Sequence, residues 1–164
     1  MKAGKKIVSK IVLCAILIFI LINAFWFIWR TQRYGNYGQK METNPAATWM
    51  VPRYKLTDAD GFDYGVKYPD YLSFTGNLSV GLPSNGDNLF TDGLIIWPKA
   101  FGGYEYGVAL IEGDTEYQIY IHADGTAVDP ENSEIVARNQ EKIAVLLQKA
   151  EEMWNLENKL TKAV

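Results

Sequence analysis

The side chain best able to act as a general base is His122, the single histidine of the 164-residue chain. A hydrolytic triad needs such a base beside a nucleophile, but the sequence contains no Gly-x-Ser-x-Gly elbow. His122 follows a run of alternating residues, where we expect the solvated end of a strand. The single cysteine, Cys14, lies in an apolar run, so a zinc site built from histidine and thiolates is not expected. These residue types predict no catalytic residue and no metal site.

Oxygen-bearing side chains gather at two expected turns and could hold calcium. They are Asp58, Asp60 and Asp63 around Gly61, and then Asn85, Asp87, Asn88 and Asp92. The first cluster departs from the EF-hand loop, because its glycine is fourth rather than sixth. Turn formation explains both clusters without a metal, since Asp, Asn and Gly are the usual turn residues. We expect no cofactor, and a hydrolase that uses carboxylates or His122 is kept as an alternative.

Aromatic residues are the more unusual feature, with ten tyrosines and five tryptophans in the chain. Tyrosine and tryptophan offer large contact areas at low entropic cost, which suits them to recognition surfaces. Most of them alternate in step with apolar residues and are expected in the core. Tyr71 and Tyr120 fall instead with polar neighbours. We therefore predict that Tyr71 and Tyr120 are exposed binding residues.

An apolar run from Ile11 to Trp29 contains one strongly polar residue, Asn23. As a helix this run would be about 28 Å long, close to the hydrocarbon thickness of a bilayer. Lysines precede it, and Arg30 ends it after a cluster of aromatic residues, as is typical of a membrane interface. A cleaved signal peptide and a buried core helix are the alternatives, but the run is long for a signal core and no small-x-small cleavage site follows. We predict a signal anchor that crosses the bilayer once, with Asn23 tolerated near its outer end.

Charge also divides the chain into a basic N-terminal part and an acidic remainder. Residues 1–43 hold seven Lys or Arg and one acid, a net of 7 − 1 = +6, and residues 44–164 hold nine and eighteen, a net of 9 − 18 = −9. An acidic body is poorly suited to nucleic acid, so no nucleic-acid partner is expected. Four lysines before the apolar run outnumber Arg30, Arg33 and Lys40 after it. This bias predicts a plasma-membrane protein with a cytoplasmic N-terminus and an extracytoplasmic C-terminal domain.

The remaining sequence predicts a separate domain of the α+β class. Residues 1–10 are a basic flank, residues 30–48 are polar and read as a tether, and residues 49–164 form the domain. Alternating apolar residues predict about five antiparallel strands, at residues 62–68, 72–82, 94–97, 104–112 and 116–122. Gly113-Asp114 between the last two is the pattern of a type II′ hairpin turn. Gly76 predicts a bulge or a bend.

The helical period begins after Asp129-Pro130, which suit the N-cap and the first helical position. An apolar stripe then recurs every three or four residues, which predicts one long C-terminal helix over residues 130–158 packed on the sheet. The stripe is polar near residues 138–140, so a division into two helices stays open.

These patterns assign the chain to no known family. They favour a non-enzymatic, membrane-anchored interaction module that binds a protein partner or an envelope polymer. The alternative is a small accessory subunit of a membrane complex that acts mainly through residues 11–29.

Overall fold

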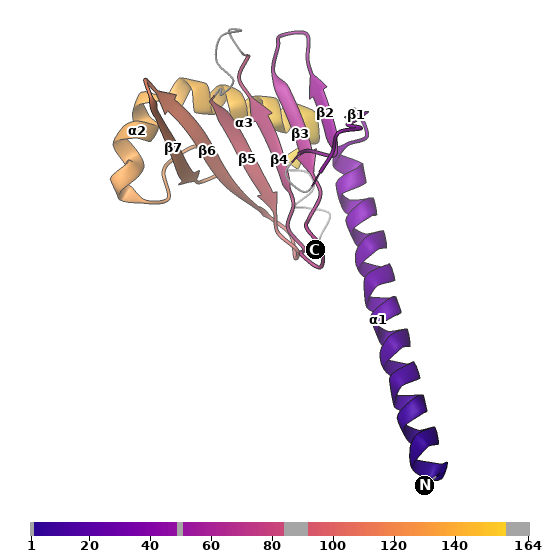
Figure 1. Ribbon diagram of the computed structural model, residues 1–164. Coiled ribbons are helices and arrows are strands. Elements are labelled where there is room, and N and C mark those ends of the chain that lie inside the picture. Colours follow the sequence, from indigo (N-terminus) through magenta and orange to yellow (C-terminus); the bar gives the residue numbers. More distant parts are fainter. Residues whose placement is uncertain (1, 49–50, 84–91, 157–164) are drawn as a thin grey trace.

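The structure is a computed structural model that describes residues 2–48, 51–83 and 92–156. It consists of a long helix α1 (Lys2–Tyr37), an antiparallel sheet, a 3-10 turn η1 (Pro130–Asn132), and two helices, α2 (Ser133–Arg138) and α3 (Gln140–Trp154). Figure 1 shows α2 and α3 covering one side of the sheet, while the N-terminal part of α1 projects away from the rest of the molecule.

The sheet has seven strands, and each strand pairs with the next one along the chain. The strands are β1 (Glu42–Thr43), β2 (Tyr54–Thr57), β3 (Asp63–Lys67), β4 (Asn77–Gly81), β5 (Gly93–Pro98), β6 (Tyr104–Glu112) and β7 (Thr115–Ile121). Because side chains alternate along a strand, one face of the sheet is apolar. That face carries Tyr64, Val66, Leu78, Val80, Leu94, Ile96, Val108, Leu110, Ile119 and Ile121, all buried.

Helix α3 covers the apolar face with the stripe that the sequence predicts. Ile143, Leu146 and Ala150 are fully buried, and Trp154 is 3% exposed. The Trp154 indole packs edge-on against the Tyr64 ring, with a centroid distance of 6.0 Å. The arrangement is α+β, as expected, with the helices on one face of an antiparallel sheet.

The sheet has more strands than the sequence predicts. The prediction of about five strands missed β1 and β2, which have two and four residues and are too short for alternation to identify. The predicted strand over residues 72–82 is also too long, because β4 begins only at Asn77. Leu72, in the middle of the β3–β4 loop, has a left-handed φ of 58°.

The prediction of one long C-terminal helix is wrong, and the alternative of two helices is confirmed. The chain breaks between α2 and α3 at Asn139, where φ is −105° and ψ is 15°. The buried Asn139 amide donates to Glu112 Oε1 (2.8 Å) and to the Ile135 carbonyl (3.0 Å), and these bonds hold the corner. Residues 157 and 158, the predicted end of the helix, lie outside the described residues.

The predicted hairpin turn is confirmed. Glu112 pairs with Thr115 across the turn, and Gly113 has a φ of 62°, which glycine adopts without steric cost.

Residues 30–48 are not the polar tether that their composition predicts. Helix α1 continues unbroken to Tyr37, and Glu42–Thr43 form the first strand of the sheet. Tyr34 is fully buried and Tyr37 is 8% exposed, and both belong to the core formed by the sheet and α3. The predicted domain start at residue 49 lies outside the described residues, but the packed core already includes the end of α1.

Candidate functional site

The end of α1 is held against the sheet by hydrogen bonds to the loops between strands. The Trp26 indole donates to the Ser73 carbonyl (2.7 Å), and the Tyr34 hydroxyl accepts from the Gly76 amide (2.7 Å). On the far side, the Trp154 indole donates to the Tyr37 carbonyl (3.2 Å). These bonds run between the helix and two distant parts of the chain, so α1 has a defined position on the domain.

The β5–β6 loop also contacts α1, through Arg33. Arg33 Nη1 donates to the Ala100 carbonyl (2.9 Å), and Nη2 donates to the Lys99 carbonyl. The Arg33 guanidinium also lies 5.3 Å from the Trp29 ring centroid, a cation–π distance. Arg33, one of the basic residues expected to flank the membrane, therefore attaches the β5–β6 loop to the helix.

Asn23 has a partner in the domain. Its side-chain oxygen accepts a hydrogen bond from the Tyr71 hydroxyl, and its amide donates to the Phe19 carbonyl (2.8 Å). Tyr71 also packs edge-on against Trp26, with a centroid distance of 5.4 Å. The expectation that Asn23 is merely tolerated is therefore wrong, because Asn23 marks the point where the β3–β4 loop first contacts α1.

The opposite face of the sheet carries no helix among the described residues, and we name it the open face. Strand register places two rows of side chains on it. The first row is Lys55, Gly65, Ser79, Ile95, Gly107 and Tyr120, and the second is Thr57, Asp63, Gly81, Gly93, Ala109 and Gln118. Small residues dominate the middle of both rows, so this face is hollowed where a sheet normally carries side chains.

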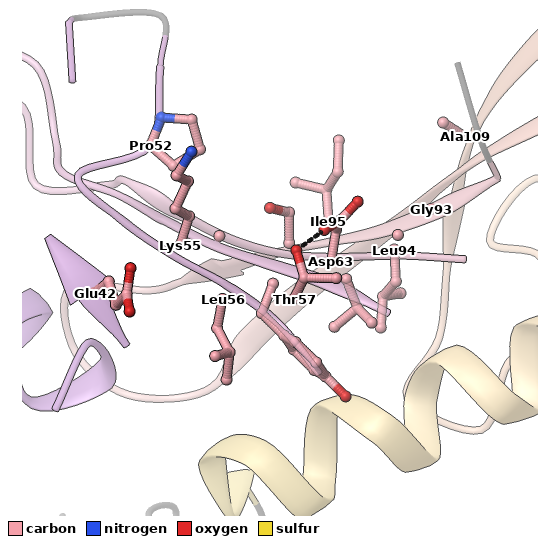
Figure 2. Close-up of a pocket in the computed structure, with 15 residues that line it drawn as sticks. Glu42, Pro52, Lys55, Leu56, Thr57, Asp63, Gly93, Leu94, Ile95 and Ala109 are labelled. Carbon is pink, nitrogen blue, oxygen red and sulfur yellow. Dashed lines mark hydrogen bonds between the residues drawn. The ribbon is translucent and has the colours of Figure 1, made fainter. Parts of the chain in front are cut away.

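The hollow is a groove of about 700 Å³. Its floor includes the backbone around Gly65, Gly81 and Gly93, and Figure 2 shows Lys55 and Pro52 on the open side while Leu94 points toward α3. Gly65 lets its neighbours pack closely, because a Cβ at this position would lie 2.6 Å from Ser79 Oγ and 3.1 Å from Pro52 Cγ, so both side chains would have to shift. A groove with this floor has room for a flat or extended segment.

An aromatic pair on β5 and β7 lines a smaller cavity beside the groove, with Ile95 and Ala109 common to both. The rings of Trp97 and Tyr120 lie 5.6 Å apart, and Tyr120 is 56% exposed. Trp97 lies directly over Gly107, where a Cβ would come within 2.9 Å of the indole ring. Glycine therefore lets the indole lie flat on the sheet, which presents a broad aromatic surface beside the groove.

Tyr71 and Tyr120 are both exposed, but the structure does not bring them together. Tyr71 is 61% exposed in the β3–β4 loop and contacts α1, while Tyr120 lies on the open face. Their role in binding stays a prediction. Trp97 and Gly107 beneath it were not identified as site residues from the sequence. Glycines inside the predicted strands were a signal for them, because a strand glycine often marks a close approach of another group.

His122 and the acid clusters have ordinary surroundings. His122 is exposed just after β7. Burial opposes ionisation of Asp58, but hydrogen bonds from the Phe62 amide, the Tyr64 hydroxyl and the Asp60 amide, with nearby Lys149, outweigh it and lower its pKa. Within the described ranges, no three His, Cys, Asp or Glu side chains lie close enough to hold a metal. Asn85, Asp87 and Asn88 lie outside the described residues.

No protein-family model, curated protein or solved structure matches the chain.

Proposed function

We propose that this protein is a single-pass plasma-membrane protein that presents a non-enzymatic interaction domain outside the membrane. The observation that carries the proposal is the division of α1 into two halves. Every large apolar side chain from Ile11 to Ile22 is at least half exposed, whereas Tyr34 and Tyr37 lie in the core of the domain. One helix thus offers an apolar surface to lipid and is built into the domain at its other end.

The docking of α1 favours an uncleaved anchor over a removed signal peptide. Cleavage after the apolar run would separate the run from Arg30, but Trp26 is already 5% exposed and bonded to Ser73. A cut there would remove a side chain that the domain has buried. The exposure of Ile11 to Ile22 also argues against a core helix, which would be covered by protein.

The interaction surface in this proposal is the open face, with its groove and the Trp97–Tyr120 pair. A sheet face with an aromatic pair beside a shallow groove suits a protein segment or an envelope polymer that packs flat against it. Because α1 is fixed to the domain, the open face would hold a set position relative to the bilayer.

Membrane attachment is tested on the full chain expressed in cells. We expect the protein to stay in the membrane pellet after carbonate extraction, to keep its intact mass, and to lose its C-terminal domain when protease is added to intact cells. Release by carbonate would contradict the anchor, and full protection from protease would contradict the orientation.

The open face is tested by placing a photo-crosslinking residue at Gln118, on the open face beside Trp97 and Tyr120, and at Gln148, exposed on α3. The expected result is a discrete crosslinked product from position 118 that Tyr120→Ser weakens and that position 148 does not give. A parallel sedimentation assay with purified envelope polymer identifies a non-protein ligand. Equal crosslinking from both positions, with no polymer binding, would contradict the proposal.

The alternative of an accessory subunit acting through α1 is distinguished by exchanging residues 7–22 for an unrelated apolar sequence. Residues 23–37 must be kept, because Asn23, Trp26 and Tyr34 are bonded to the domain. Function that survives the exchange supports the interaction module, and function that is lost supports the membrane subunit.

A further inference from the structure

A cavity of about 630 Å³ lies where α1 meets the sheet, and we name it the junction pocket. Helix α1 lines it with Trp26, Phe27, Arg30 and Thr31, and the start of β2 and the β3–β4 loop add Arg53, Tyr54, Tyr68 and Tyr71. Two arginines thus line a cavity to which five aromatic side chains also contribute.

Arg30 is held by ring faces rather than by acids. Its guanidinium carbon lies 4.6 Å from the Trp26 ring centroid, 5.2 Å from that of Tyr68 and 5.4 Å from that of Phe27. Its Nε atom is buried and has no hydrogen-bond partner among the described residues. A buried donor on a cation is costly unless an acceptor reaches it, so the site lacks an anionic acceptor.

The charge of the junction pocket is not balanced within the described part of the chain. Neither Arg30 nor Arg53 forms an ion pair there, and the one carboxylate that lines the cavity, Asp70, lies 3.9 Å from Lys67 Nζ. Arg30 stacks on rings while its guanidinium edge stays free for a tetrahedral anion, the geometry in which arginine recognises phosphate.

The level of the junction pocket along α1 identifies the source of the phosphate. Residues 11–22 are exposed on all sides and span about 18 Å, well short of the roughly 30 Å of a hydrocarbon core. From Asn23 on, the domain covers one side of α1, while Phe25, Phe27 and Ile28 stay exposed on the other. The contacts of Tyr71 with Asn23 and Trp26 therefore bring the β3–β4 loop into the interfacial layer. Exposed Leu72 and Phe74 on the same loop suit that layer. Arg30 is then at headgroup depth.

We propose that the junction pocket binds the phosphate group of a membrane phospholipid, with Arg30 and Arg53 as its ligands and the acyl chains lying along the apolar part of α1. This inference rests on the membrane anchoring proposed above. Its consequence is that lipid completes the attachment of the helix to the domain, because the phosphate bridges α1 and the start of β2.

The test measures lipid binding to the full chain in detergent micelles by native mass spectrometry. The probes are phosphatidylglycerol and diacylglycerol with the same acyl chains, which lacks the phosphate. We expect retention of phosphatidylglycerol but not of diacylglycerol. Because each arginine–phosphate contact is a charge-assisted bond, Arg30→Gln and Arg53→Gln should each weaken binding about tenfold or more.

Lys99→Gln is the matched control. Lys99 is exposed, lies in the other loop that contacts α1, and does not line the junction pocket, so its loss should leave lipid binding unchanged. Arg53→Gln removes an exposed side chain and keeps the test valid if Arg30→Gln unfolds the protein, while Arg30→Lys shows whether charge alone suffices.

Equal binding of the two lipids, or unchanged binding in the Arg53 and Arg30 variants, would overturn the proposal. Displacement of the lipid by inorganic phosphate alone would identify soluble phosphate as the ligand and would also overturn it. Carbonate extraction measures membrane anchoring independently of lipid binding. A protein that is anchored but does not bind the lipid would therefore contradict this inference and leave the proposed function intact.

Discussion

At the scale of single residues, Tyr34 is the side chain that joins α1 to the domain most closely. It is fully buried, and its hydroxyl accepts the Gly76 amide at 2.7 Å. Gly76 permits this approach because a Cβ there would lie 2.2 Å from the Lys67 carbonyl oxygen and 2.8 Å from the Tyr34 ring. Gly76, where the sequence predicts a bulge or a bend, lies in the loop just before β4 and is a contact site for the helix.

Tyr34→Phe should destabilise the domain by about 1–3 kcal/mol, because the buried Gly76 amide loses its acceptor while the packing of the ring is kept. Denaturant unfolding of the full chain in micelles measures this change. Tyr71→Phe is the control: it removes an exposed hydrogen bond to Asn23 and leaves no buried group without a partner, so it should destabilise the domain by less than about 1 kcal/mol. Equal effects of the two substitutions would contradict the special position of Tyr34.

At the scale of elements, ion pairs fasten the helix layer to loops and strand ends of the sheet. Lys149 on α3 lies 2.9 Å from Asp60 and 3.7 Å from Asp58, both in the β2–β3 turn. At the other end, Arg138 on α2 lies 3.1 Å from Glu112 at the end of β6. Hydrogen bonds from Arg138 and Asn139 lower the pKa of Glu112, just as the turn lowers that of Asp58.

These lowered pKa values predict a loss of stability in acid. A carboxyl group whose pKa is lower in the folded state stabilises the fold above its unfolded pKa, and this contribution is lost as the pH falls. The unfolded values are 3.8 for Asp58 and 4.5 for Glu112. The melting temperature should therefore fall as the pH drops below about 4.5, and it should be nearly constant from about pH 6 to 7.

A double variant, Asp58→Asn with Glu112→Gln, should be less stable at neutral pH and should lose less stability in acid than the unaltered chain. Glu131→Gln, which removes an exposed carboxylate of η1, serves as the control and should keep the full acid dependence. Thermal melts across the pH range measure both effects. An unchanged acid response in the double variant would show that other carboxylates control it.

At the scale of the whole molecule, α1 belongs to two environments. Its N-terminal part has an apolar, exposed surface, and its last turns are part of the core beneath the sheet. The domain therefore begins within α1, and not after it where the polar sequence starts.

Fragments of the chain test this boundary. A fragment of residues 24–164 keeps Trp26, Tyr34 and Tyr37 and should unfold cooperatively with dispersed amide NMR signals. A fragment of residues 49–164 lacks these side chains and β1, so its core is uncovered and it should not give such a spectrum. Equal stability of the two fragments would show that α1 is dispensable for the fold.

Local pattern was sufficient where neighbours in sequence are neighbours in space. The β6–β7 hairpin was predictable from Gly113 and its alternating flanks, and the stripe on α3 was predictable from its period. The helix break at Asn139 was readable only as an alternative, because its cause is a bond to Glu112, 27 residues away. Of the predicted binding residues, the pattern indicated exposure but not the contacts of Tyr71 with α1.

The sequence by itself determined that one long apolar helix precedes an acidic α+β domain, because hydropathy and periodicity are properties of short windows. Tertiary structure decided what the polar residues after that helix do. Tyr37 meets Trp154 across 117 positions of the chain, and Arg33 meets Ala100 across 67. Contacts between residues so far apart produce no periodic pattern in the sequence, because they depend on where the folded sheet places its loops. The open face exists only once the strands have paired, and the junction pocket only once the loops have packed on α1.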